Sequence, residues 1–134
     1  MMKRSLVALA MVVAVLGAGI PALAQTCTTC CTVSLGSPWY RIASTTGSLS
    51  WGGARYYTTT LYAGVTYQIV LRVPWGVDFD MVVYDENNNV VGRSTRGGDC
   101  DEIVTVTPRW TGTFTIKVYS HSGSGCFTLQ LYRR

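Results

Sequence analysis

Apolar and polar side chains alternate along much of this chain. Alternation is typical of β-strands that bury one face, because successive side chains on a strand point to opposite faces. Residues 78–84 show it most clearly: Phe79, Met81 and Val83 form an uncharged face, and we expect the other face at a partly wet surface. The run 85–89 is rich in residues that favour turns, and extended chain then resumes. This stretch predicts a β-hairpin whose first strand faces a core.

The same alternation predicts further short strands. We expect them at residues 39–43, 55–62, 65–73, 103–107, 113–121 and 126–132. Glycine and proline turns separate these segments, and the Ser/Thr/Gly-rich segment 44–53 is expected to be a loop. No helical periodicity is sustained after residue 24. Seven or eight short strands at regular spacing predict an all-β, antiparallel β-sandwich, with a closed barrel as the alternative.

The N-terminus has the layout of a secretory signal peptide. Lys3 and Arg4 precede an uncharged apolar run at residues 6–20, and a small-residue site follows at residues 22–24. Cleavage after Ala24 would send the chain to the periplasm or the medium and leave no membrane span. A retained membrane anchor is the alternative, although the run is shorter than the ~20 residues that a span needs.

The exported part is long enough for one domain with a core and too short for two. We expect a cysteine-rich arm at residues 25–53, which can include a first strand, and a sandwich at residues 54–134. Loss of Lys3 and Arg4 would lower the net charge from +4 to +2. The arginines are scattered and form no basic run, so nucleic acid is not expected as a partner.

All five cysteines lie in the exported part, where an oxidising compartment makes disulfides the default. We predict a Cys100–Cys126 disulfide, and we leave open the pairing of Cys27, Cys30 and Cys31, which cluster in the arm. An odd count leaves one thiol over, which either stays free or joins two chains into a homo-oligomer. A zinc site on the three clustered cysteines and a distant fourth ligand is the alternative.

Several of these segments follow one another in the order of a known family. They are 61–67 (LYAGVTY), 78–85 (DFDMVVYD) with the turn 87–89, 101–104 (DEIV), 111–119 (TGTFTIKVY) and 125–131 (GCFTLQL). In this order the chain, from about residue 54 to 132, resembles the bacterial pre-peptidase C-terminal domain. The resemblance implies a jelly-roll-like sandwich that is not catalytic and aids secretion, localisation or substrate attachment. We expect two departures from that family: a sandwich without a catalytic domain, and a cysteine-rich arm before it.

Nucleophilic hydrolysis has little support in the residues. His121 is the single histidine, and a catalytic triad needs an oriented base with an acid behind it. No pattern places a nucleophile and a carboxylate around His121, so we expect a solvated side chain at a strand end. The sequence therefore predicts a protein that is not an enzyme.

Carboxylates near two strand starts suggest a calcium site. Asp78 and Asp80 begin one strand, and Asp99 and Asp101 precede another, so oxygen-rich loops could meet at one end of a sandwich. The alternative is that these acids are solvated, together with Glu102, or paired with nearby arginines.

A second calcium pattern fails on its own spacing. Asp85, Asn87 and Asn89 look like the start of a calcium loop, but Val90 stands where the loop needs Gly and Arg96 where it needs Glu. Turn chemistry explains these residues.

Aromatic side chains suggest a binding surface. Trp75 lies in a Pro-Trp-Gly loop beside Asp78, where an exposed ring could stack on a sugar, and we take this pair as a ligand-binding hypothesis. The alternative is packing of the aromatic rings in the core and rim. Two functions follow as hypotheses: a secreted, non-catalytic binding module for a surface polysaccharide or a partner protein, or a structural subunit of an extracellular assembly joined through strand edges.

Overall fold

The computed structural model describes residues 35–36, 38–98 and 100–134. Eight strands make up most of this part of the chain, and it contains no helix, so none that could span a bilayer. The strands are β2 (Tyr40–Leu49), β3 (Ala54–Leu61), β4 (Tyr67–Arg72), β5 (Asp78–Tyr84), β6 (Val90–Ser94), β7 (Glu102–Val106), β8 (Gly112–Ser122) and β9 (Gly125–Arg133).

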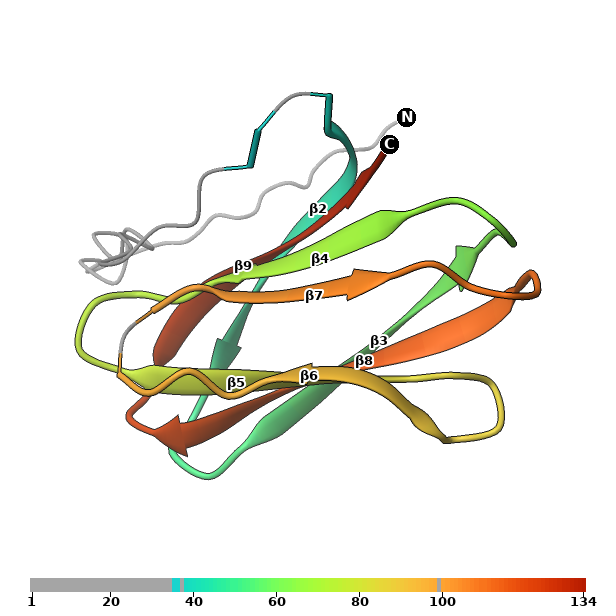
Figure 1. Ribbon diagram of the computed structural model, residues 1–134. Helices are drawn as coiled ribbons and strands as arrows, with labels where there is room; N and C mark the ends of the chain where they lie inside the picture. The colour runs from blue at the N-terminus through green and yellow to red at the C-terminus, as the bar shows by residue number, and fades with distance from the viewer. Residues whose placement is uncertain (1–34, 37, 99) are drawn as a thin grey trace, which may run out of the picture.

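Two four-stranded antiparallel sheets stack face to face (Figure 1). The first, called here the β2 sheet, has the strand order β2-β9-β4-β7, and the second, the β3 sheet, has the order β3-β8-β5-β6. Most neighbours within a sheet are distant in sequence, because the chain crosses repeatedly between the two sheets, as in jelly-roll sandwiches. The predicted all-β antiparallel sandwich is confirmed.

The two long sides of the sandwich differ. On one side β6 and β7 contact each other and close the gap between the sheets. On the other side β2 and β3 leave the turn at residues 50–53 and diverge (Figure 1). Within the described ranges, β2 and β3 each have a hydrogen-bonded strand on one side only. This open side therefore presents two strand edges.

The core fills the space between the sheets. Phe79, Met81 and Val83 of β5 are fully buried, as their alternation predicted. Phe127 of β9 packs edge to face against Phe79 and Tyr57, with ring centroids 6.2 Å apart in both pairs. Burial of one such side chain contributes about 1.5–3 kcal/mol. The rest of the core comprises Leu49, Leu61, Tyr67, Ile69, Leu71, Val73, Val77, Val104, Val106, Phe114, Ile116, Val118, Leu129 and Leu131.

Strand β2 extends further than its sequence predicted. The segment 44–49 was expected to be a loop, and this expectation is wrong, because the segment pairs with β9 along its whole length. Thr46, for example, lies opposite Thr128. Ser and Thr suit a strand whose outer face meets water, so pairing with β9 overrides the loop-like composition.

The predicted hairpin is confirmed as β5 and β6. Asp85 organises its turn: the carboxylate accepts hydrogen bonds from the backbone N–H groups of Asn87 (2.8 Å) and Asn89 (2.9 Å) and from Asn89 Nδ2 (3.1 Å). Asn88 takes the left-handed conformation (φ 63°), which asparagine tolerates. The carboxylate thus serves the turn, as the sequence predicted for this segment.

Candidate functional site

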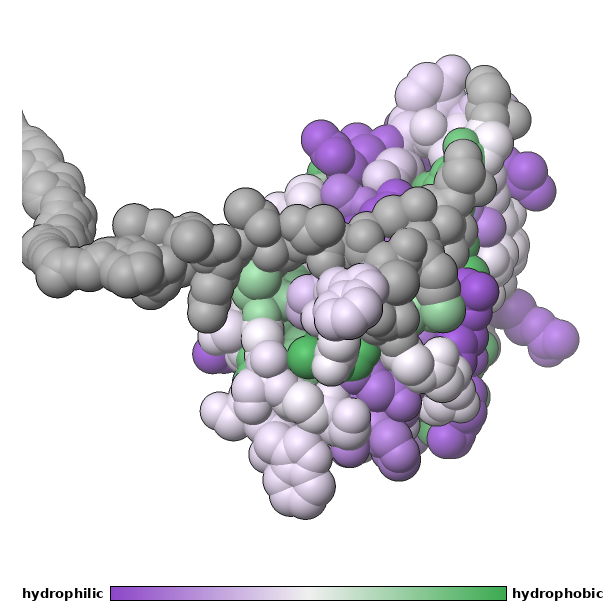
Figure 2. Space-filling view, turned by 90° about the vertical axis from the view of Figure 1, so that its left-hand side faces the viewer, coloured by the Kyte–Doolittle hydropathy of each residue, from purple (hydrophilic) through white to green (hydrophobic). Residues whose placement is uncertain are grey.

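Four connections meet at one end of the sandwich, at the left of Figure 1, and they carry the ligand-binding residues predicted from the sequence. They are the β2–β3, β4–β5, β6–β7 and β8–β9 connections. Figure 2 views this end, where pale near-neutral and purple hydrophilic residues surround smaller green hydrophobic areas. The end is therefore a mixed polar surface.

Trp75 and Asp78 both lie at this end. Trp75 is 72% exposed in the β4–β5 connection, and Asp78 begins β5, with its Oδ1 buried and without a hydrogen-bond partner among the described residues. Trp51 is 71% exposed in the neighbouring β2–β3 turn, and its backbone N–H donates to Ser124 Oγ (2.9 Å). The structure thus adds a second exposed tryptophan, which the sequence analysis did not single out.

Asp80 does not lie at a wet surface, contrary to the expectation from the sequence. It is buried on the outer face of the β3 sheet, opposite Tyr119 of β8, whose hydroxyl donates to its carboxylate. Burial raises the pKa of Asp80, and the neighbouring Asp78 raises it further. The large side chain of Tyr119 accounts for the error, because period-two alternation does not report what covers an outer face.

Asp101 is fully buried before β7, and its carboxylate is engaged. Oδ2 pairs with Arg72 Nη1 (2.8 Å), and Oδ1 accepts the Val73 N–H (3.0 Å). Asp99 lies outside the described residues. Within those residues, no three His, Cys, Asp or Glu side chains form a group that could hold a metal. The calcium hypothesis stays a prediction: a bound ion should raise the midpoint of thermal unfolding by mass action.

Glu102 was expected to be a loop acid that is either solvated or paired with a nearby arginine, and the solvated alternative is wrong. The side chain is fully buried at the start of β7, and Oε1 accepts the Arg96 N–H (2.9 Å). Oε2 is buried with no partner among the described residues. Burial raises the pKa of Glu102. Its place in a Glu-Ile-Val-Thr-Val run carried a signal, since Glu102, Val104 and Val106 share the inward face of the strand.

The two cysteines of the predicted pair lie in or next to strands of the β2 sheet. Cys126 is in β9, and Cys100 lies two residues before β7. Both cysteines are disulfide-bonded. Cys27, Cys30 and Cys31 lie outside the described residues, and the pairing of all five cysteines stays a prediction.

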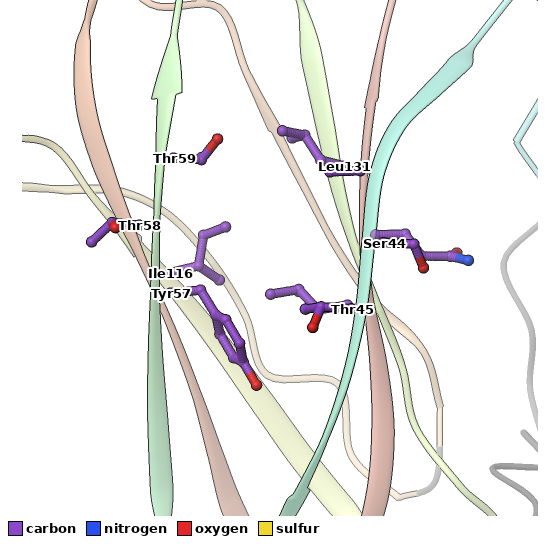
Figure 3. Close-up of a pocket in the computed structure, with 10 residues that line it drawn as sticks. Ser44, Thr45, Tyr57, Thr58, Thr59, Ile116 and Leu131 are labelled. Carbon is purple, nitrogen blue, oxygen red and sulfur yellow. The ribbon is translucent and has the colours of Figure 1, made fainter. Parts of the chain in front are cut away.

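A hollow of about 160 Å³ opens between β2 and β3 on the open side of the sandwich (Figure 3). We call it the β2–β3 groove. In Figure 3, Tyr57 and Thr59 of β3 and Thr45 of β2 line the gap between the two strands. Its other lining residues are Ala43, Ser44, Thr58, Ile116, Leu129, Gln130 and Leu131. Ile116, Leu129 and Leu131 belong to the core, so the groove gives access to core side chains from outside.

The β2–β3 groove narrows toward the turn that joins its strands. There, Arg55 Nε of β3 donates to the Ser48 carbonyl of β2 (2.7 Å) and bridges the two strands. A Cβ atom at Gly47 would lie 2.6 Å from both the Phe127 ring and Tyr57 Oη, so only glycine lets β2 approach this closely. From this end the two strands diverge, and the groove widens toward Tyr40.

The edge of β3 presents unpaired backbone groups to the groove. The Ser120 N–H donates to the Gly53 carbonyl (2.9 Å), so Gly53 and Ser120 form a hydrogen-bonded pair. Together with the register of β3 and β8, this pair determines which residues of β3 bond to β8. Bonded pairs alternate with unbonded pairs in an antiparallel ladder. Ala54, Tyr56, Thr58 and Thr60 therefore direct their N–H and C=O groups away from β8, and the described residues supply no strand to receive them.

A second hollow, of about 360 Å³, lies beside the β7–β8 connection. Asp85, Arg109 and Trp110 line it together with Thr105 and Thr107. The carboxylate of Asp85 is engaged by the β5–β6 turn, so this hollow offers fewer free groups than its volume suggests.

His121, near the end of β8, is exposed. The features of the fold and of the groove define the class of protein as an all-β sandwich with an open edge groove. Two solved structures share the fold. The pre-peptidase C-terminal domain of collagenase from Bacillus anthracis is 20% identical, with a TM-score of 0.55, over 66% of this chain and 87% of that domain. Aeromonas hydrophila PliG, a periplasmic inhibitor of g-type lysozyme, is 17% identical, with a TM-score of 0.50, over 80% of this chain and 96% of that protein.

The likeness to the collagenase domain confirms the pre-peptidase C-terminal type of fold that the sequence resemblance implied. No protein-family model matches the chain, and no curated protein matches it in sequence.

Proposed function

We propose that this chain is an exported, non-catalytic binding module that attaches to a partner protein through the open side of its sandwich. The observation that carries the proposal is the β2–β3 groove, where Leu129 and Leu131 of the core are reached between two strand edges. Unpaired strand edges are templates for another chain, and access to apolar side chains between them supplies affinity.

The two structural neighbours support a role of this kind. One is a domain of a collagenase, and the other is an inhibitor of a lysozyme, that is, of another protein. The signal-peptide layout at residues 1–24 and the periplasmic location of the lysozyme inhibitor support an exported chain.

Exposed tryptophans favour a second candidate, in which the module attaches to a surface polysaccharide. Trp51 and Trp75 are both about three-quarters exposed at the same end of the sandwich, and Asp78 lies beside Trp75. Flat aromatic rings with a nearby carboxylate suit sugar rings with their hydroxyls. The structural-subunit hypothesis rests on the same edges as the main proposal, or on the cysteine left over.

The experiment immobilises the full chain and exposes it to exported proteins of the producing organism and, separately, to insoluble polysaccharide. We expect saturable retention of a discrete protein, which Thr59→Phe abolishes by filling the groove and Trp75→Ala leaves intact. Retention on polysaccharide that Trp75→Ala abolishes would favour the second candidate. Disulfide-linked ladders on gels without reductant would favour the structural subunit, and no retention at all would overturn the proposal.

A further inference from the structure

We propose that the segment bound in the β2–β3 groove is an extended, acidic stretch of polypeptide from the partner. This inference rests on the proposed function and specifies the chemistry of its ligand. Three features carry it: the distribution of charge, the burial of the chain's own acids, and the direction of the edge backbone groups.

Charge is segregated along the chain and in the fold. All seven Asp and Glu residues lie within residues 78–102, which form β5, β6 and the start of β7. Residues 38–77 and 103–134 contain no Asp or Glu. Their lysine and arginine residues are Arg41, Arg55, Arg72, Arg109, Lys117, Arg133 and Arg134. The edge strands β2 and β3, and the strands β9 and β8 behind them, therefore carry positive charge without a carboxylate.

Arginines stand at both ends of the groove. At the narrow end Arg55 bridges to Ser48. At the wide end Arg41 and Arg133 occupy the paired ends of β2 and β9, opposite Tyr132 and Tyr40 respectively. A segment lying along the groove would place its side chains between these cations, and carboxylates there would gain charge-assisted contacts.

A second copy of this chain suits the groove poorly. Four of its acids, Asp80, Asp85, Asp101 and Glu102, are buried within their own fold. Glu86 is exposed and Asp78 partly so, while the facing edges of two copies would both be basic. Like charges across a pairing are unfavourable, so charge complementarity points to a different, acidic molecule.

The backbone groups favour polypeptide over another anionic polymer. Ala54, Tyr56, Thr58 and Thr60 present N–H and C=O groups at alternate residues, a spacing that an added β-strand matches. A strand also directs alternate side chains to one face, so small apolar side chains could enter the hollow beside Tyr57 and Leu131. A sulfated or phosphorylated polymer would meet the arginines and leave the edge unpaired.

The test titrates the full chain into a fluorescein-labelled ten-residue peptide of alternating Val and Glu, followed by fluorescence anisotropy. An alternating Val–Lys peptide is the charge control. We expect saturable binding of the Val–Glu peptide, at least tenfold weaker binding of the Val–Lys peptide, and weakening with added salt.

Two variants at one position test the backbone contact. Thr58→Pro removes an outward N–H and keeps the ladder to β8, because proline is tolerated on an edge strand. It is expected to weaken Val–Glu binding at least tenfold. Thr58→Val keeps the N–H and loses the hydroxyl, and it should bind as the wild type does. Circular dichroism establishes that both variants are folded.

Each other outcome overturns the inference. Equal binding of both peptides would exclude a preference for an acidic partner. Unchanged binding by Thr58→Pro would exclude the addition of a partner strand to the edge of β3. Tighter binding of dextran sulfate, unaffected by Thr58→Pro, assigns the groove to an anionic polymer. Self-association in ultracentrifugation that Thr58→Pro suppresses assigns it to a second copy. If an exported protein is retained while the Val–Glu peptide does not bind, the inference fails and the proposed function stands.

Discussion

Buried carboxylates of this small sandwich differ in how well they are satisfied. Asp101 uses both oxygens, one in an ion pair with Arg72 and one at the Val73 N–H. Glu102 uses one oxygen and leaves the other without a partner among the described residues. A buried polar group without a partner pays its full desolvation cost, whereas hydrogen bonds and ion pairing offset that cost. Replacement of Asp101 should therefore lower the stability of the protein, whereas replacement of Glu102 by a neutral side chain should raise it.

Replacement of Asp101 by alanine is expected to lower the free energy of unfolding by about 3 kcal/mol, because it removes one partner of a buried ion pair and frees the Val73 N–H. Glu86→Ala is the matched control at an exposed acid and should stay within about 0.5 kcal/mol of the wild type. Denaturant unfolding measures both. An Asp101→Ala variant as stable as the control would contradict the structural role of this pair.

Glu102→Gln is expected to stabilise the protein at neutral pH. Burial raises the pKa of Glu102 in the folded state, so the folded state binds this proton more tightly than the unfolded chain does. The contribution of Glu102 to the free energy of unfolding is then fully present in acid, below the pKa that Glu102 has in the unfolded chain. It is lost as the pH rises through the pKa that Glu102 has in the folded state. Thermal midpoints across the acid-to-neutral range should show the advantage of the variant growing with pH. A difference independent of pH would contradict this reading.

Asp85 should show the opposite dependence. The Asn89 backbone N–H, with further bonds from the Asn89 side chain and the Asn87 N–H, lowers the pKa of Asp85. Its contribution is present above the unfolded pKa and is lost as the pH falls through the folded value. The gap in thermal midpoint between the wild type and Asp85→Ala should therefore shrink in acid. A gap that widens in acid would show that the turn does not hold the carboxylate in its charged form.

At the scale of elements, strand β2 decides how open the sandwich is. It pairs only with β9 among the described strands, and its approach to β3 is fixed by Gly47, Ser48 and Arg55 at the turn end. Beyond these contacts the two strands separate and leave the groove. The width of the groove thus depends on a few contacts at one end of a ten-residue strand.

Gly47→Ala is expected to cost about 1–3 kcal/mol, because its Cβ would meet the Phe127 ring and Tyr57 Oη at 2.6 Å and force β2 outward. Gly97→Ala is the matched control, since nothing lies within 4 Å of a Cβ built there. Denaturant unfolding with an unchanged m-value measures the difference. Equal stability of the two variants would show that β2 is not held this closely.

How far the sequence predicts this molecule depends on the scale of each feature. Alternation in 78–84 and 126–132 identified inward side chains correctly, because it is set within one strand. The pairing of 44–49 with β9 could not be read from that segment, because its partner lies more than seventy residues away. Arg72 likewise meets Asp101 across 29 residues. The groove depends on two consecutive strands entering different sheets, which no local pattern reports.

At the scale of the whole molecule, the sandwich has a closed side and an open side with different charge. All seven acids lie in residues 78–102, the segment that runs from β5 through β6 to the start of β7 and so includes the closed side. The open side carries two strand edges, access to core side chains and basic residues only. The groove and the basic residues therefore coincide on the open side, which is the basis for proposing an acidic segment as its ligand.

Hydrogen exchange at the β3 edge tests the central claim most directly. In the protein alone, the N–H groups of Tyr56, Thr58 and Thr60 should exchange fast, whereas those of Tyr57 and Thr59, which bond to β8, should exchange slowly. A saturating Val–Glu peptide should protect the first set. Slow exchange of Tyr56, Thr58 and Thr60 in the protein alone, or no added protection with the peptide, would contradict an open edge that receives a partner strand.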